Sequence, residues 1–258
     1  MDLGIRGKRA LVTASSRGLG RGCALALAEA GVDLVLNARG AEALAATAAA
    51  IRATHGVGVV EVAADVTSAE GRAAVLNAAG EVDILVTNAG GPPPGLWSEW
   101  SREDFIRALD ANMLTPIALM QACLPGMMAR GWGRIINIGS TAASVGWKDN
   151  PAYCASKAGL LGLTRCVALE GAPHGVSCVM ISPTWVETEL MRRNVAQLVA
   201  REGKGRTLED AMADIAAENP QQRIIQPSEV ASLAAYLCRQ EARGITAENI
   251  QITGGALW

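Results

Sequence analysis

Tyr153 and Lys157 stand four positions apart, and Ser140 lies thirteen residues before the tyrosine. Residues four apart share one face of a helix, so the lysine ammonium would lie beside the phenol. A neighbouring positive charge lowers the pKa of a tyrosine, which would let Tyr153 exchange a proton near neutral pH. A serine hydroxyl beside that phenol can hydrogen-bond a carbonyl oxygen. The three residues suit proton transfer to or from a carbonyl oxygen while a hydride moves at carbon.

The same spacing has an ordinary interpretation, in which a lysine stem covers a half-buried tyrosine on a solvated helix. The chain holds only two tyrosines and four lysines, so a chance match is uncommon. The elements that would position these residues must decide between the two interpretations.

Composition excludes several classes of protein. Half of the 258 residues are hydrophobic, aromatic residues are scarce, and the net charge is −2 without a basic patch. We therefore expect an aliphatic core and no nucleic-acid partner. No stretch reaches the length of a membrane span and no signal peptide is apparent, so no membrane partner is expected.

The six cysteines and two histidines are scattered, with no metal-ligand spacing among them. We expect free thiols, no metal site and a reducing, cytoplasmic location.

An apolar run at 10–13 predicts a buried strand, followed by a glycine-rich turn and a helical stretch at 21–30. In that arrangement backbone N–H groups can hold a pyrophosphate, although a plain tight turn is the alternative. Ala14 occupies the place of the first glycine of the usual fingerprint. The candidate contacts in this segment are Thr13, Ser15, Ser16, Arg17, Gly18, Leu19 and Gly20.

A second predicted strand, 32–36, leads to Arg39 and to no carboxylate. NAD-binding folds place a carboxylate there, on the ribose 2′-hydroxyl, whereas arginine binds a phosphate in a bidentate way. Arg39 and Arg17 therefore favour NADP(H) over NAD(H). The alternative is that Arg39 begins a solvated loop.

Asp65 follows a third predicted strand at 57–63 and could either accept a hydrogen bond from adenine or cap the next helix. A fourth strand, 82–86, leads into the sequence 88–90. Ser101 begins a helical stretch in which Pro116 removes the hydrogen bond to the carbonyl of Asn112, freeing that carbonyl for a water. A surface asparagine is the alternative.

Ser140 ends a fifth strand at 133–140, and the helix that carries Tyr153 runs to about residue 170. A sixth strand at 176–181 and a last one at 249–253 complete a sevenfold alternation of strands and helices. This predicts an α/β fold with one doubly wound, parallel, seven-stranded sheet. We expect a single domain, 1–258, with a lid at about 184–219 over the ligand site.

In their order and spacing, these motifs resemble the short-chain dehydrogenase/reductase family over nearly the whole chain, and 3-oxoacyl-acyl-carrier-protein reductases most. The resemblance implies a Rossmann fold with Tyr153 as general acid/base, Lys157 lowering its pKa and binding the nicotinamide ribose, and Ser140 positioning the substrate oxygen. Asn112 would hold the water of a proton relay. Further cofactor contacts implied are Asp65, Val66, Asn88, Ala89, Gly90, Pro183, Val186 and Thr188. Ala14, Thr87 and Thr184 depart from the family pattern, and Ala14 places the affinity for the cofactor in doubt.

We therefore expect an NADP(H)-dependent oxidoreductase that interconverts a carbonyl and a secondary alcohol, with a 3-oxoacyl compound or small ketone as substrate. Trp147 and Trp185, with Ser140 and Tyr153, are the candidate substrate contacts, and Trp97 could join them. The alternatives are an NAD-dependent 3-hydroxyacid, sugar or polyol dehydrogenase, and a non-catalytic nicotinamide-binding sensor or structural protein. The resemblance also implies a homotetramer, with the C-terminal segment 255–258 as a candidate contact.

Overall fold

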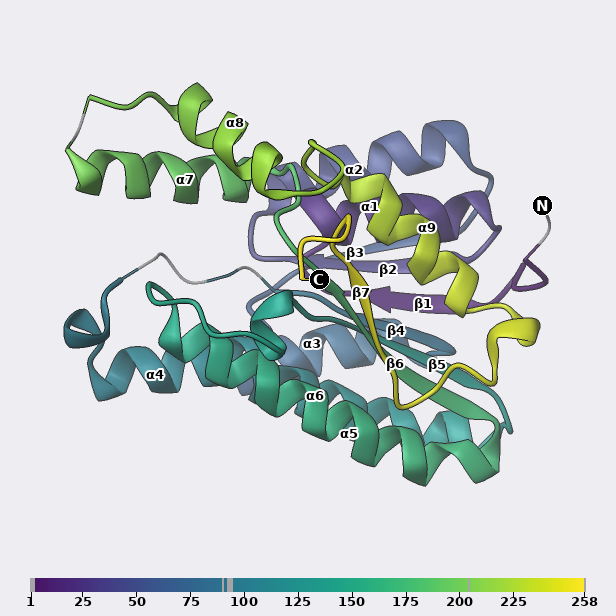
Figure 1. Ribbon diagram of the computed structural model, residues 1–258. Helices are drawn as coiled ribbons and strands as arrows, with labels where there is room; N and C mark the ends of the chain where they lie inside the picture. Colours follow the sequence, from purple (N-terminus) through teal and green to yellow (C-terminus); the bar gives the residue numbers. More distant parts are fainter. Residues whose placement is uncertain (1–2, 90, 92–94, 204, 258) are drawn as a thin grey trace.

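The computed structural model describes residues 3–89, 91, 95–203 and 205–257. Its centre is a seven-stranded sheet in the order β3-β2-β1-β4-β5-β6-β7, and every neighbouring pair is parallel (Figure 1). The strands are β1 (Arg9–Val12), β2 (Asp33–Ala38), β3 (Val59–Ala63), β4 (Ile84–Thr87), β5 (Gly133–Ile138), β6 (Val176–Pro183) and β7 (Asn249–Ile252). All seven predicted strands and the predicted sheet are confirmed.

Helices cover both faces of the sheet (Figure 1). One face carries α1 (Gly18–Glu29), α2 (Ala41–Thr54) and α9 (Pro227–Leu237), and the other carries α3 (Ala69–Ala79), α5 (Thr115–Ala129) and α6 (Pro151–Gly171). The helix α4 (Arg102–Leu109) joins α5 through a π-helical turn, Asp110–Leu114. Short 3₁₀ helices lie at Trp97–Glu99, Thr141–Ala143, Ala172–His174 and Gln240–Ala242.

The central strands are apolar because each is buried on both sides, as expected for a parallel sheet. Alternate residues of β1 and its neighbour β4 enter different cores: Leu11 and Leu85 face α5 and α6, whereas Val12 and Val86 face α1 and α9. β4, β5 and β6 are buried throughout, but the edge strands β3 and β7 are not.

Two further helices, α7 (Glu189–Glu202) and α8 (Leu208–Glu218), stand out as a pair beyond the carboxyl end of the sheet (Figure 1). They share a small core of their own, built on Met191, Val195, Ala211 and Met212. Thr188 caps the start of α7 and Gly203 ends it in the left-handed region. The segment predicted to form a lid, at about 184–219, therefore contains two helices, and α7 and α8 are called the lid below.

In the part of the chain that the structure describes, no helix combines the length and the apolar character needed to cross a membrane.

Candidate active site

The fold brings Ser140, Tyr153 and Lys157 together at the carboxyl end of β5. Ser140 lies two residues beyond that strand, and the other two occupy the first turns of α6. The Ser140 hydroxyl lies near enough to the Tyr153 phenol to favour its ionised form, and the Lys157 Nζ lies 5.5 Å from the centroid of the Tyr153 ring. The structure therefore brings these three predicted side chains together, and their catalytic roles stay predictions.

Burial dominates the ionisation of this group. It raises the pKa of Tyr153 to about 12, against a smaller lowering by the hydrogen bond with Ser140. It lowers the pKa of Lys157 to about 8. The Lys157 Nζ donates a 2.8 Å hydrogen bond to the carbonyl oxygen of Ile138. The Lys157 ammonium is thus directed to a backbone carbonyl, and its lowering of the Tyr153 pKa stays a prediction.

Asn112 lies within the π-helical turn between α4 and α5, a departure from regular helix that is often found at functional sites. Its side chain is buried, with Nδ2 donating to the carbonyl oxygen of Ala108 at 3.1 Å and Oδ1 lacking a partner. The alternative of a surface asparagine is therefore wrong. The predicted helix through Pro116 is interrupted, since α5 begins at Thr115 with the proline in its first turn. The water on the Asn112 backbone remains a prediction.

The glycine-rich turn between β1 and α1 is drawn tightly against the end of β4. A Cβ atom on Gly20 would stand 2.4 Å from the oxygen of Ala14 and 2.8 Å from Nδ2 of Asn88, so only glycine fits there. Ala14 has φ of 47°, a left-handed conformation that costs a non-glycine residue about 1–2 kcal/mol. Ala14 is therefore strained at a position where the family pattern has glycine.

Thr13 and Ser15, two predicted cofactor contacts, hold the turn in place. The Thr13 hydroxyl donates to the carbonyl oxygen of Asn88 at 2.8 Å and accepts from its N–H at 2.9 Å. The Ser15 hydroxyl makes the same pair of bonds with Asn37 at 3.2 and 3.0 Å. Both hydroxyls are buried. Their side chains therefore join β1 to β4 and β2, which makes Thr13 and Ser15 positioning residues for the turn.

The start of α1 is suited to an anion. A serine or threonine side chain caps α3, α4, α7 and α8, whereas α1 begins at Gly18 with no side-chain cap and no acidic residue in its first turn. Within the described part of the chain no side chain caps the backbone N–H groups there, and these groups carry the positive end of the helix dipole. The residues present fit the pyrophosphate of a dinucleotide, in the segment that Ser16, Arg17 and Leu19 share with Gly18.

The residues predicted near the adenosine end are exposed. Arg39 follows β2, and its charge reaches Asp65 beyond β3. Hydrogen bonds from the backbone (3.0 Å) and hydroxyl (2.8 Å) of Thr67, together with the Arg39 charge, lower the pKa of Asp65. Ser68, not Asp65, caps α3, so the capping alternative for Asp65 is wrong. The adenine contact of Asp65 and the neighbouring, half-buried Val66 stays a prediction.

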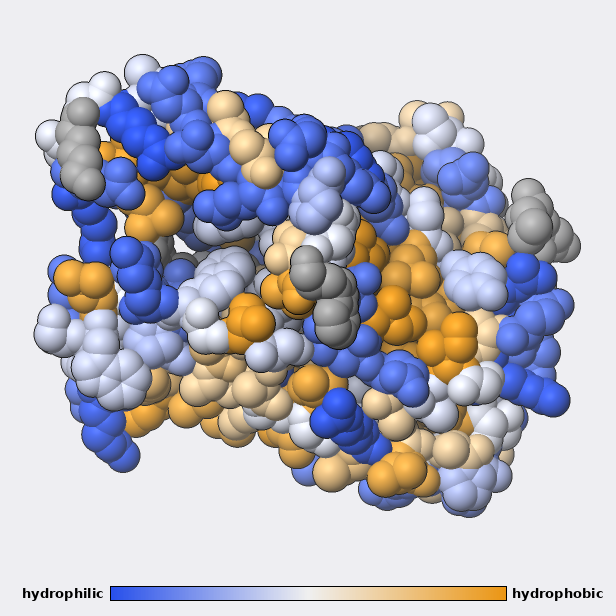
Figure 2. Space-filling view, viewed as in Figure 1, coloured by the Kyte–Doolittle hydropathy of each residue, from blue (hydrophilic) through white to orange (hydrophobic). Residues whose placement is uncertain are grey.

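The remaining predicted contacts surround one cavity of about 140 Å³. Thr188 lies against the turn, because a Cβ on Gly18 would stand 3.3 Å from its Cγ2. The cavity opens toward the lid, where the surface is hollowed at the left of Figure 2. Its lining residues include Leu19, Ser140, Trp147, Tyr153, Pro183, Trp185, Val186 and Thr188. The half-buried Asn88 and Ala89 follow β4 at the same sheet edge, and Gly90 lies outside the described residues.

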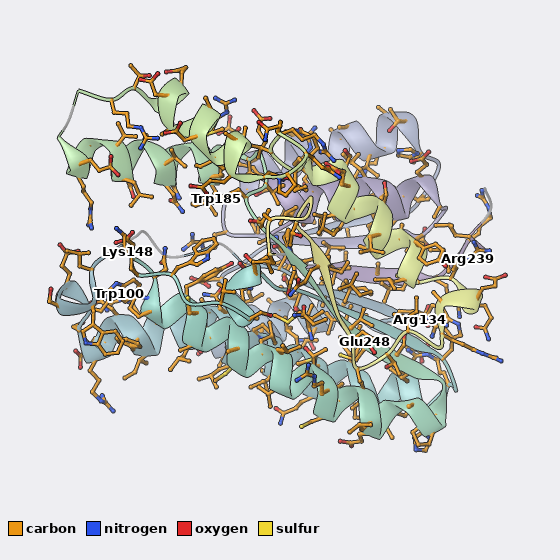
Figure 3. All side chains as sticks on the ribbon, in the orientation of Figure 1. Trp100, Arg134, Lys148, Trp185, Arg239 and Glu248 are labelled. Atoms are coloured by element: carbon orange, nitrogen blue, oxygen red, sulfur yellow. The ribbon has the colours of Figure 1, made fainter. Side chains whose placement is uncertain are left out.

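The indole rings of Trp147 and Trp185 are stacked, with centroids 5.2 Å apart and an angle of 21° between the planes. In Figure 3, Trp185 lies where the chain leaves the sheet for the lid. Trp97 is 72% exposed and packs edge-on against Phe105 at 5.8 Å. It does not line the cavity, so the suggestion that Trp97 joins the substrate pocket is wrong.

Sequence analysis missed several residues of the cavity. Asn150 lines it, and its Oδ1 is buried without a partner. Its position three residues before Tyr153 was the available signal. The lid side chains Leu190, Met191, Asn194 and Leu198 also line the cavity, at helical spacing. That spacing indicated a helix face but did not show which cavity the face covers.

Comparison with known proteins gives consistent relatives. A short-chain dehydrogenase family model, described as enoyl-(acyl carrier protein) reductase, matches residues 13–256. D-beta-hydroxybutyrate dehydrogenase of Cupriavidus necator is 34% identical over 259 residues, which cover 98% of this chain and 96% of that protein. The 3-oxoacyl-(acyl-carrier-protein) reductase FabG of Vibrio cholerae is 34% identical over 257 residues, with 98% of each chain covered.

Solved structures agree with the sequence relatives. L-sorbose reductase from Gluconobacter frateurii, solved with NADPH and L-sorbose, superposes with a TM-score of 0.93 at 30% identity and covers 100% of this chain and 99% of that one. These likenesses span the sheet, the glycine-rich turn and the Tyr153 site together. The chain belongs to the short-chain dehydrogenase/reductase family, whose members are oxidoreductases acting on alcohol and carbonyl groups.

Proposed function

We propose that the protein is an NADP(H)-dependent reductase of a 3-oxoacyl compound or small ketone, with Tyr153 as the proton donor. The observation that carries this proposal is the joining of Ser140, Tyr153 and Lys157 beside one cavity. That cavity also reaches Thr188, which touches the anion-binding turn. A nicotinamide cofactor held along this path would end beside the phenol.

Bound NADPH supplies the hydride. The Ser140 hydroxyl donates a hydrogen bond to the substrate carbonyl oxygen, which orients and polarises it. Tyr153 transfers its proton to that oxygen as negative charge develops there. With a pKa of about 12, the phenol keeps its proton at neutral pH and is in the state needed for reduction.

Lys157 has two tasks in this proposal. Its ammonium, whose pKa burial lowers to about 8, would contact the nicotinamide ribose and supply positive charge as Tyr153 loses its proton. Asn112, which lies in the π-helical turn, would hold on its main-chain carbonyl a relay water that returns a proton to the site.

The preference for NADP(H) is supported by the charges around the end of β2. Asn37 is buried, and its Nδ2 donates to two carbonyl oxygens near β3, each at 3.0 Å. Arg39, which is exposed just after β2, carries a positive charge there. That charge suits the 2′-phosphate of NADP(H) better than the ribose hydroxyl of NAD(H). The L-sorbose reductase neighbour was solved with NADPH.

A second candidate is the oxidation of a small 3-hydroxy acid with NAD, favoured by the 34% identity to D-beta-hydroxybutyrate dehydrogenase. In that direction Tyr153 would act as the base, and Arg39 would face a ribose hydroxyl in place of a phosphate, so the cofactor preference separates the two candidates. We also propose a homotetramer in the cytoplasm. The half-buried edge strand β7 leaves an unpaired side for a second copy. Trp258 lies outside the described residues.

The test is a matrix of cofactors and substrates. NADPH and NADH consumption is measured with 3-oxobutanoyl thioester, small ketones and L-sorbose, and NADP⁺ and NAD⁺ reduction with 3-hydroxybutyrate. We expect the fastest turnover with NADPH and a 3-oxoacyl thioester or ketone. Faster turnover with NAD⁺ and 3-hydroxybutyrate would select the second candidate, and no turnover in any combination would support the non-catalytic alternative.

A further inference from the structure

Two cavities lie next to each other beyond the carboxyl end of the sheet. The catalytic cavity is the one of about 140 Å³ lined by Ser140 and Tyr153. A second, the rear cavity, measures about 180 Å³ and lies between the loop after β6, the lid helix α8 and the C-terminal segment. Trp147, Thr184 and Trp185 line both. The stacked indoles are therefore a shared wall between two separate spaces.

Both indoles are anchored on the body of the protein. Trp147 precedes α6, and its backbone N–H donates to Sγ of Cys154 at 3.4 Å. Trp185 precedes Val186, which is buried and pairs with Ile225 as an isolated parallel β-bridge. With their rings stacked at 5.2 Å, each indole restricts the movement of the other. Trp185 also packs against the small core of the lid, so contacts with both the body and the lid hold the wall in place.

We propose that the stacked Trp147–Trp185 pair sets the length of the substrate, so that the natural substrate is a compact carbonyl compound and the rear cavity is closed to it. The inference rests on the proposed reduction of a carbonyl beside Tyr153. The catalytic cavity of about 140 Å³ is bounded by the two indoles on the side that faces the rear cavity. A substrate chain that runs from the phenol in that direction would have to displace an indole once it outgrew the catalytic cavity.

The rear cavity has apolar and polar walls. Ile215, Ile224 and Leu257 are apolar, whereas Glu218 and Asn219 are polar. Its arginine, Arg223, is engaged by Glu229 through two hydrogen bonds of 2.6 and 2.8 Å. Because that guanidinium already has a carboxylate partner and Glu218 adds a negative charge, the rear cavity disfavours an anion, and its apolar walls suit an alkyl chain. Removal of the wall would join the two cavities into one channel for a longer acyl or alkyl group.

The test compares chain-length preference in the wild type and Trp185→Ala, with Trp97→Ala as the matched control because Trp97 lines neither cavity. The probes are 2-butanone, 2-hexanone and 2-octanone. Their binding is measured by calorimetry with NADP⁺, a pair that cannot react, and their kcat/KM is measured with NADPH. We expect Trp185→Ala to raise the affinity and kcat/KM for 2-octanone relative to 2-butanone at least tenfold, since each added methylene buried in a pocket is worth about tenfold or more.

Trp97→Ala should leave that ratio unchanged. An unchanged ratio in a folded Trp185→Ala, or an equal change in Trp97→Ala, would overturn the proposal. Should Trp185→Ala fail to fold, Trp185→Leu and Trp147→Ala each remove one ring of the stack and carry the same expectation. The binding arm separates this inference from the proposed function: absent turnover of every ketone in the wild type defeats the function, whereas a length ratio that ignores the wall defeats the inference.

Discussion

The catalytic cavity lies between the body of the protein and the lid, and different interactions hold these two sides in place. On the body side, the Thr13 and Ser15 hydroxyls join three strand ends through buried hydrogen bonds of 2.8–3.2 Å. On the lid side, Arg17 pairs with Glu189 at 2.9 Å, with the two side chains 67% and 76% exposed. A second exposed pair joins Arg201 of the lid to Glu99 at 3.0 Å.

The difference follows from the cost of breaking each contact. A buried hydrogen-bonding group that loses its partner costs about 1–3 kcal/mol, whereas an exposed ion pair contributes about 0–1 kcal/mol and is screened by salt. The body side, which must fix the turn and the proton donor, is therefore rigid. The lid side can adjust at small cost. The predictions below test this division, from the largest effect to the smallest.

Removal of the Tyr153 hydroxyl should have the largest effect. Tyr153→Phe keeps the ring but loses the proton donor, and general acid catalysis contributes about 10²–10⁴-fold. We expect kcat for ketone reduction to fall by that factor with the affinity for NADPH nearly unchanged, measured by steady-state kinetics and cofactor titration. Tyr236→Phe, at the other tyrosine of the chain, is the control. Equal turnover of Tyr153→Phe and wild type would remove Tyr153 from the chemistry.

Arg39 is expected to discriminate between cofactors. A hydrogen bond to a charged group contributes about 1.5–3 kcal/mol, so Arg39→Ala should raise KM for NADPH roughly 10–100-fold and leave KM for NADH nearly unchanged. Arg243→Ala, an exposed arginine beyond α9, is the control. Equal changes for NADPH and NADH would show that Arg39 does not contact the 2′-phosphate.

Short-range patterns made most of this site predictable. Tyr153 and Lys157 are four apart on one helix, and the turn from Ala14 to Gly20 lies between a strand and a helix, so spacing alone placed them. The raised pKa of Tyr153 was not predictable, because it depends on how far the folded chain buries the phenol. The bond from Lys157 to the Ile138 carbonyl was not predictable either.

Contacts between segments that are far apart in the sequence could not be predicted either. Thr13 and Asn88 are 75 positions apart, and the Trp147–Trp185 stack joins two loops from different crossovers. Hydrophobic periodicity describes which face of an element is buried, but not which loops meet at the end of a sheet. The hydroxyl bonds of Thr13 and Ser15 to other strands could not be predicted for the same reason, and their cofactor contacts stay predictions.

The buried charge of Lys157 should reduce stability in the wild type. Its pKa falls from 10.5 to about 8, and one pKa unit corresponds to about 1.4 kcal/mol. Lys157→Met removes that penalty but leaves the Ile138 carbonyl without its donor. We expect the variant to be about 1–2 kcal/mol more stable than wild type at pH 7 by urea unfolding, while its catalysis is lost.

The pH dependence of the stability is a second test of the buried lysine charge. Between about pH 8 and 10.5 the folded lysine is neutral while the unfolded one is still protonated, so wild-type stability rises with pH in that window. The advantage of Lys157→Met should therefore shrink from pH 8 to 10.5. Lys148→Met, at an exposed loop position, should show no such trend. A destabilised Lys157→Met with a flat pH profile would contradict the buried charge.

The smallest effect is expected at the lid. Glu189 holds Arg17 in an exposed pair, so Glu189→Gln should change Tm by about 2 °C or less. It should also free Arg17 for the 2′-phosphate and lower KM for NADPH up to about fivefold at low salt, with the gain lost at high salt. Glu209→Gln, in the first turn of α8, is the control. A large loss of stability would show that the lid side is as rigid as the body.

The central claim is that a hydride moves to carbon while Tyr153 gives a proton to oxygen. The direct test is reduction of a ketone with NADPH deuterated on either face of C4, followed by mass spectrometry and NMR of the alcohol. One of the two labelled cofactors should place one deuterium on the carbinol carbon in the wild type, and Tyr153→Phe should form that same product at a rate lower by about 10²–10⁴-fold. Alcohol without deuterium at that carbon from both cofactors, or labelled alcohol formed equally fast by Tyr153→Phe, would contradict the account.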